Sequence, residues 1–332
     1  MTNPVHSERQ GPRVTLPAWT GRQWLEFLVV TGLVPAVFLA VLVLAGVDNQ
    51  WVDLLAQFTA PALVATAGLT ILLGVVRMKA AITLSMLAVV VLAATVWPQW
   101  FPRGPAADRD APVVRLYSAN LFYRNTDTAA IRRSIEAADA DIVVLIELGD
   151  APALRIDELL EGYPHRSASM PLDWNRGQPP SLIASRWPLT VRVVPPDGLQ
   201  AVAATAKTPL GPVNFVGVHL TRPWPFQESW GQISQTMALD DLVRSLDGPV
   251  IVAGDFNSVS GARIGKQIRR DIGVRPASGF PGTWPSGLPS VLGVTIDQVY
   301  ASADLAFVSR RLGEAMGSDH RPVVTEFTRA RD

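Results

Sequence analysis

The chain has 332 residues, contains no cysteine, and balances 29 Lys and Arg against 29 Asp and Glu, so its formal net charge is zero. Hydrophobic residues make up 48% of it and the mean hydropathy is +0.22, which is too apolar for an ordinary soluble domain of this length. Disulfide bonds are excluded, and the balanced charge gives no sign of a strongly basic, nucleic-acid-binding chain.

The apolar excess is concentrated in three charge-free runs near the N-terminus. Phe27–Val47, Leu54–Val76 and Ala80–Phe101 contain 21, 23 and 22 residues. Each run is long enough to cross roughly 30 Å of hydrocarbon as a helix. A buried helical hairpin is the alternative, but core helices keep a polar stripe and seldom run this long without charge. We therefore predict three transmembrane helices, at about 27–47, 54–76 and 80–100.

The charges beside these runs predict their orientation. The flanking bases are Arg9, Arg13 and Arg22 before the first run, and Arg77 and Lys79 between the second and the third. The first connector, Asp48–Asp53, carries two acids and no base. Because Arg and Lys resist translocation, we expect the tail 1–26 in the cytoplasm and the chain after Phe101 outside. A cleaved signal peptide is the competing interpretation of the first run, but two further runs favour an uncleaved anchor.

A short linker and one larger domain are predicted to follow. Residues 102–112 are polar and rich in Pro and Ala. A linker of this length spans at most about 33 Å when extended. The predicted extracytoplasmic domain, 113–332, is therefore held close to the outer membrane face.

Within this domain, β-branched runs alternate with amphipathic helical patches, which indicates an α+β fold with mostly buried sheets. Strands are predicted at Val113–Ala119, Ile142–Ile146, Ser181–Ser185, Ala201–Thr208, Val213–His219, Val250–Ala253, Thr295–Ala301 and Arg321–Phe327. Helices are predicted at Thr128–Ala138 and Glu228–Leu246.

Polar residues recur where the predicted strands end, and loops at strand ends are where functional sites are built. These residues are Asn120, Glu147, His219, Asp255 with Asn257, Asp297, and Asp319 with His320. Each has an ordinary explanation when taken singly: a turn residue, a loop acid, a tight Gly-Asp-Phe-Asn turn, a helix cap. Their joint occurrence in this order is specific. Asp297 lies among apolar neighbours, and since a buried carboxylate needs a partner we expect it to pair with His320.

The strings around these residues resemble the endonuclease/exonuclease/phosphatase superfamily from about Val113 to Thr328. They are Ser-Ala-Asn-Leu, Leu-Ile-Glu-Leu, Gly-Val-His-Leu, Gly-Asp-Phe-Asn, Ile-Asp-Gln-Val and Ser-Asp-His-Arg-Pro. Many members carry Gln where this chain has Ile146, but the Glu that follows is kept. The resemblance implies a four-layer α/β/β/α sandwich, here preceded by three transmembrane helices, with the site at one end.

The resemblance also implies a metal-dependent phosphoesterase, a hydrolase. Carboxylate and amide oxygens suit Mg²⁺ or Mn²⁺. Glu147 is the expected main metal ligand, with Asn120 and Asp319 nearby. Asp255 is expected to deprotonate the attacking water, while Asn120, Asn257 and His219 donate to the phosphoryl oxygens. His320, held by Asp297, would face the phosphate as the imidazolium.

The substrate is predicted from context. From Pro112 onward there are 22 Lys and Arg and 23 Asp and Glu, a net of 22 − 23 = −1, which disfavours nucleic acid. Tethering beside the bilayer favours a lipid-linked phosphate. Arg222 is a candidate phosphate ligand, and the Trp224, Phe226 and Trp230 that follow it are candidates for contact with the membrane interface. Alternatively, this Pro-rich loop packs its aromatic side chains on the domain.

Three spans followed by an exported domain of this superfamily resemble the actinobacterial membrane proteins associated with resistance to teicoplanin. That resemblance implies envelope chemistry, with polyprenyl pyrophosphate or a related lipid-linked precursor as substrate. Two other functions stay open: an exported metal-dependent nuclease, and a non-catalytic protein that binds an envelope precursor or the antibiotic.

Overall fold

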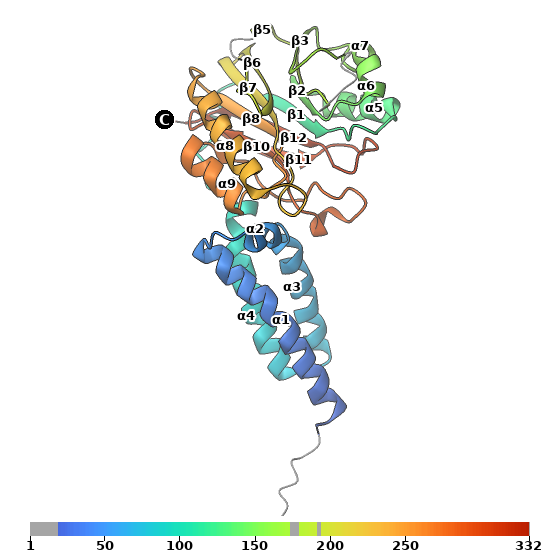
Figure 1. Cartoon of the computed structure of the whole chain (residues 1–332), viewed down its shortest axis with the longest axis vertical. Helices are drawn as coiled ribbons and strands as arrows, with labels where there is room; N and C mark the ends of the chain where they lie inside the picture. The colour runs from blue at the N-terminus through green and yellow to red at the C-terminus, as the bar shows by residue number, and fades with distance from the viewer. Residues whose placement is uncertain (1–18, 173–178, 191–193, 332) are drawn as a thin grey trace, which may run out of the picture.

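The structure, a computed structural model, describes residues 19–172, 179–190 and 194–331. Apolar helices form a narrow stalk, and a two-sheet domain sits on one end of it (Figure 1). Most of the tail predicted to be cytoplasmic, including Arg9 and Arg13, lies outside the described residues.

Four helices build the stalk: α1 (Gly21–Ala45), α2 (Gln50–Ala56), α3 (Thr59–Val75) and α4 (Lys79–Trp100). Among the described residues, α1 and α4 are long and apolar enough to cross a membrane. The run predicted as a single middle span is instead a broken pair, because α2 and α3 meet at an angle of 59°. The described residues therefore contain two candidate spans, or three if the bent pair is counted as one.

Side chains on the outside of the stalk are apolar. Leu28 and Phe38 on α1, Ile71 and Val75 on α3 and Val90 on α4 are 62%, 62%, 72%, 75% and 64% exposed. Exposed apolar surface on this scale is unfavourable in water and favourable in lipid. The stalk is thus suited to a membrane.

The domain contains two six-stranded sheets. The first has the strand order β11 (Leu305–Leu312), β12 (Val323–Arg329), β1 (Val114–Asn120), β2 (Ile142–Ile146), β4 (Leu182–Ser185) and β3 (His165–Ala168). The second has the order β5 (Leu189–Thr190), β6 (Gln200–Thr208), β7 (Gly211–His219), β8 (Val250–Asp255), β10 (Asp297–Ala301) and β9 (Arg275–Pro276).

Helices lie between the strands in sequence. They are α5 (Thr128–Ala138), α6 (Asp150–Leu154), α7 (Ile156–Leu159), α8 (Ser229–Arg244) and α9 (Arg263–Gln267), with a π-helical turn at Ile268–Ile272 and a 3-10 turn at Ser290–Leu292. The apolar residues of α5 recur on one face, as in Ile131 and Ile135, which are buried. The mixed α+β architecture follows from this alternation.

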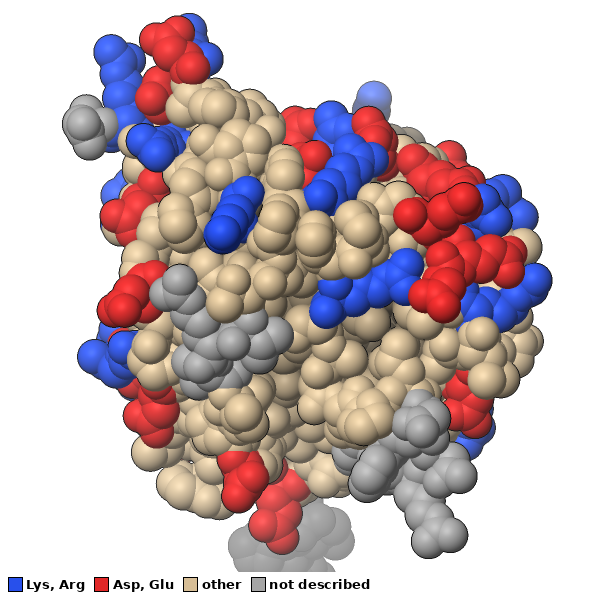
Figure 2. Space-filling model, turned by 90° about the horizontal axis from the view of Figure 1, so that it is seen from above, with Lys and Arg blue, Asp and Glu red and all other residues tan. Residues whose placement is uncertain are grey.

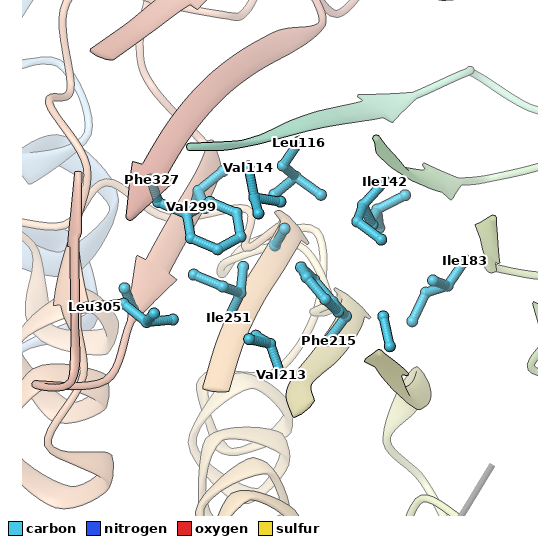
Figure 3. Packing of buried hydrophobic residues seen from close by; sticks show 14 of the residues in the cluster. Val114, Leu116, Ile142, Ile183, Val213, Phe215, Ile251, Val299, Leu305 and Phe327 are labelled. Carbon is cyan, nitrogen blue, oxygen red and sulfur yellow. The ribbon is translucent and has the colours of Figure 1, made fainter. Parts of the chain in front are cut away.

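One apolar core lies between the two sheets. Leu116 and Ile142 come from the first sheet, and Phe215 and Ile251 from the second (Figure 3). A second cluster joins the first sheet to α5, and a third joins the second sheet to α8. Alternate residues of one strand serve different cores, since Leu116 enters the first cluster and Tyr117 the second.

The domain is attached to the stalk by direct contacts as well as by the chain. The predicted linker, 102–112, runs beside the end of β12, where Asp108 N–H donates to Arg329 O over 3.0 Å. At the end of α4, Ser278 Oγ donates to Trp100 O over 2.7 Å. Domain and helices are therefore in contact along several segments.

Candidate active site

The first sheet brings two predicted site residues to one edge. Asn120 ends β1 and Glu147 directly follows β2, and these two strands run parallel. Carboxyl ends of parallel strands meet at the same edge, so both side chains lie there. His320 precedes β12, which is antiparallel to β1, and therefore reaches this same edge.

The second sheet, on the other side of the core, also brings predicted site residues to one edge. His219 and Asp255 end the parallel strands β7 and β8 and are paired in register. Asp297 begins β10, which is antiparallel to β8, and lies opposite Asp255. Residues scattered over two hundred positions of sequence thus meet at one end of both sheets.

Asn120 connects the two sheets at this end. Its Nδ2 donates to Asp255 Oδ2 over 3.0 Å and to Glu147 Oε1 over 3.3 Å. Its Oδ1 accepts from the Phe122 N–H at 2.9 Å. In this arrangement the amide presents donors to both carboxylates and stabilises their negative charge, while its oxygen is engaged by the backbone.

Glu147 is held in an unusual backbone conformation. Its φ is +52°, in the left-handed region that non-glycine residues rarely adopt. The Tyr123 N–H donates to its Oε2 over 3.3 Å, and His219 Nε2 lies 3.5 Å from its Oε1. Backbone strain of this kind persists where the surroundings over-determine a conformation, often at functional sites.

Asp255 lies at the centre of the site and is 1% exposed. Gly254 before it has φ +143°, and a Cβ there would lie 2.0 Å from Val218 O, so only glycine lets β8 approach β7 this closely. The Asn257 N–H donates to Asp255 Oδ1 over 2.8 Å. Burial raises the pKa of Asp255 although the nearby His320 opposes the rise, which makes the carboxylate a better base.

Asp297 and His320 form a close pair. The Nδ1 of His320 lies 2.9 Å from Asp297 Oδ2, and its Nε2 lies 3.9 Å from Asp255 Oδ2. Burial lowers the pKa of His320, but the Asp297 and Asp255 carboxylates outweigh that effect and raise it to about 10. The ring is therefore an imidazolium at neutral pH, with Nδ1 fixed by Asp297 and Nε2 turned to the site.

The donor set at the centre fits a hard divalent cation. Ligand atoms of Glu147, His219 and Asp255 all lie within 4.8 Å of one another. Two largely buried carboxylates this close repel each other unless a positive charge compensates them. Two carboxylates beside an imidazole are donors that Mg²⁺ or Mn²⁺ accepts.

Two predicted residues lie at the rim of the same cleft, a cavity of about 280 Å³ that also contains Glu147, Asp255 and His320. Asp319 is exposed, and its Oδ2 accepts from Trp284 Nε1 over 3.3 Å. Arg222 is also exposed. The structure thus places both at the cleft but outside the central cluster of ligand atoms.

The aromatic loop after Arg222 divides its side chains. Trp224 packs edge-on against Trp51 of α2, with ring centroids 4.4 Å apart. Phe226 and Trp230 remain 66% and 63% exposed. One aromatic therefore attaches the loop to the stalk, and two are presented to the surroundings.

Several residues at the site were not predicted. Ser318 Oγ donates to Asn120 O over 2.8 Å and accepts from the His320 N–H at 3.0 Å, so it links two site loops. Leu54, Gln57 and Phe58 reach the cleft from the break between α2 and α3. Gln57 carried a signal, since an amide inside an otherwise apolar run calls for a polar partner.

Comparisons with known proteins concern the family and the fold of the domain. The sequence pattern of the endonuclease/exonuclease/phosphatase family matches residues 117–320. The curated UPF0294 protein VP2298 of Vibrio parahaemolyticus is 32% identical over 97 residues, 29% of this chain. That match spans only 33% of the relative's own length.

Solved structures share the fold. An endonuclease/exonuclease/phosphatase from Beutenbergia cavernae superposes with a TM-score of 0.51 and 20% identity, covering 66% of this chain and 72% of its own. One from Bacteroides vulgatus superposes with a TM-score of 0.54 and 16% identity, covering 66% and 99%. At such identities the likeness concerns the fold alone.

Proposed function

This chain belongs to the endonuclease/exonuclease/phosphatase family, and we propose that it is a membrane-anchored, divalent-metal-dependent phosphohydrolase for a lipid-linked phosphate or pyrophosphate of the cell envelope. The observation that carries the proposal is the position of the site. Leu54, Gln57 and Phe58 of the apolar helices line the same cleft as Asp255 and His320. The two-sheet domain sits directly on one end of these helices (Figure 1). A substrate anchored in a bilayer would meet the site there.

The central cluster would hold Mg²⁺ or Mn²⁺. Glu147 would be the main ligand of the ion. The Asp255 carboxylate lies close to that of Glu147, and Asp319 lies at the rim of the cleft. When bound, such an ion neutralises negative charge that develops on the phosphoryl oxygens.

The chain's own residues supply the remaining chemistry. Asp255 accepts a proton from water as the water oxygen bonds to phosphorus, and the bond between phosphorus and the leaving oxygen breaks in line. The His320 imidazolium faces the phosphate, oriented by Asp297. Asn120, Asn257 and His219 are expected to supply further N–H donors to the phosphoryl oxygens. The amide N–H groups of Asn120 and Asn257 donate to neighbouring oxygens in the structure, and they would turn to the phosphate once a bound cation compensates the Glu147 and Asp255 carboxylates.

Charge distribution supports a lipid substrate over nucleic acid. From Pro112 onward, 22 Lys and Arg are balanced by 23 Asp and Glu, so the domain has no basic excess. On the face turned away from the helices, which lies opposite the cleft, basic and acidic residues are interspersed (Figure 2). A polyanion would be gripped by a basic face. Phe226, which lines the cleft, and Trp230 on α8 are both exposed, and aromatic side chains favour a membrane interface.

Two finer parts of the proposal rest on resemblance. The helices packed on each sheet would give the four-layer α/β/β/α sandwich of the family. The helical anchor followed by this domain resembles the teicoplanin-resistance membrane proteins of actinobacteria, VanJ among them. A role in resistance to teicoplanin-type glycopeptides follows as part of the proposal.

The proposed activity is tested with the full-length protein in detergent. We expect phosphate release from a polyprenyl pyrophosphate in Mg²⁺, reduced at least about 100-fold by EDTA and restored by added Mg²⁺. Plasmid cleavage without phosphate release would make the protein an exported nuclease. If the protein shows neither phosphate release nor plasmid cleavage, the proposed function is overturned.

The proposed orientation puts the domain outside and the N-terminus in the cytoplasm. Because the chain has no cysteine, single cysteines report on it directly. We expect Ala303→Cys, at an exposed domain position, to react with a membrane-impermeant maleimide in intact cells. The matched control, Ser7→Cys in the N-terminal tail, would react only after lysis. Labelling with the reverse pattern would invert the topology.

A further inference from the structure

The break between α2 and α3 is bonded to the catalytic loop. Gln57, at the break, is 6% exposed. Its Oε1 accepts from the Val259 N–H at 2.7 Å, and its Nε2 donates to Ser258 Oγ over 3.4 Å. Ser258 and Val259 directly follow Asn257, so a residue from the stalk fixes the loop that carries part of the site.

Further contacts keep the break in place. Arg263 Nη1 lies 3.1 Å from Asp53 Oδ2, in an ion pair between α9 and α2. Val52 and Ala56 of α2 are buried in one apolar cluster with Ile296 of the domain. Because polar and apolar contacts both cross this boundary, the break is a fixed part of the cleft.

The exposed side of the break forms an apolar wall beside the reacting centre. Leu54 and Phe58 line the same cavity as Asp255 and His320. Leu54 is half-buried and Phe58 is 44% exposed, so Phe58 keeps apolar surface available to a ligand. The cleft therefore combines charged residues of the domain with apolar side chains, and the stalk supplies two of these apolar side chains.

We propose that Leu54 and Phe58 bind the hydrophobic chain of the substrate next to its phosphate, which makes the helix break a specificity-determining part of the active site. This inference rests on the proposed function and names the part of the substrate that the stalk recognises. The wall is continuous with the phosphate end and lies where the domain meets the apolar helices, so a chain rising from the bilayer passes it on the way to Asp255. A water-soluble phosphoester has no hydrophobic chain to contact Leu54 and Phe58.

The test compares two pyrophosphates that share a headgroup and differ in chain length, farnesyl and dimethylallyl pyrophosphate. We expect Phe58→Ala in the full-length protein to lower the ratio of kcat/KM for the long over the short substrate by about 10- to 200-fold. Phe58→Leu keeps an apolar side chain and is expected to recover most of the ratio. Phe38→Ala, on the outer surface of α1, is the matched control and is expected to leave the ratio unchanged.

The outcomes separate this inference from the proposed function. Equal losses on both substrates in Phe58→Ala, or no loss on either, would overturn the chain-binding role while the phosphohydrolase stands. A Phe58→Leu variant as poor as Phe58→Ala would also overturn it. Wild-type protein that hydrolyses neither pyrophosphate would remove the proposed function, and the inference with it.

Discussion

Asp255→Asn is expected to reduce phosphate release by about 10²- to 10⁴-fold, the contribution of a positioned general base. The substitution keeps the shape of the side chain but removes its basicity and its charge. The amide keeps one acceptor oxygen, so either Asn120 Nδ2 or the Asn257 N–H retains its partner and the other loses it. The measurement is kcat with a polyprenyl pyrophosphate in saturating Mg²⁺.

Asp241→Asn is the matched control for this variant, since Asp241 is exposed on α8. Its rate and its thermal unfolding are expected to equal those of the wild type. The Asp255→Asn variant is expected to remain folded and to show a cooperative unfolding transition. Burying a carboxylate costs free energy, and replacing it by an amide also removes its repulsion from Glu147. Wild-type turnover by a folded Asp255→Asn protein would contradict the assigned role.

The same variant separates an enzyme from a binder. If the protein protects cells from teicoplanin by hydrolysis, cells that produce Asp255→Asn are expected to be as sensitive as cells without the protein. A non-catalytic protein that sequesters a precursor would protect them equally well in both forms.

Asp297→Asn is expected to lower kcat by about 10²- to 10⁴-fold through its effect on His320. The Nδ1 of His320 lies 2.9 Å from Asp297 Oδ2, and this carboxylate helps raise the pKa of the ring against the effect of burial. With a neutral amide there, the largest effect opposing burial is removed, so the pKa of His320 falls and the cationic form that faces the phosphate is less populated. The measurement is kcat beside a binding assay for the substrate.

Asp304→Asn, in the exposed loop after β10, is the control for Asp297→Asn and is expected to retain full activity. A loss in Asp297→Asn that is confined to KM would indicate that the pair binds substrate without acting in the transition state. Unchanged kcat and KM would show that His320 needs no partner.

Central strands of the domain could be predicted from sequence because their residues are buried on both faces. Ile142–Ile146 was predicted with the bounds that β2 has, and β8 extends its prediction by two residues to Asp255. β3 and β11 were missed because they lie at the edges of the first sheet, where one side of the strand has no neighbour and side chains need not be apolar. In β11, the residues Val308 and Ser309 are exposed.

The candidate site was predictable where polar residues follow apolar strands, since strand order in a sheet collects them. The parts of the site that depend on packing of the stalk helices against the domain could not be predicted from the sequence. A charge-free run of 23 residues indicates that a helix can cross a membrane. It does not indicate that the Val259 N–H of a distant loop donates a hydrogen bond to Gln57 Oε1. That contact lies at the break between α2 and α3, and it is formed only in the folded protein.

The end of α4 carries a consequence for how the two parts of the protein can be separated. Gln99 O accepts from the Gly279 N–H at 2.7 Å, and a Cβ on Gly279 would lie 2.8 Å from that oxygen. The last turn of the stalk helix α4 is thus capped by the domain. Val259 and Ile296 of the domain are in turn covered by apolar side chains of the stalk. Cutting the chain after Phe101 would leave bare carbonyls on one fragment and an uncovered apolar patch on the other. A foreign membrane helix grafted onto the domain would restore attachment but not this shared surface, so anchor and enzyme are not interchangeable modules.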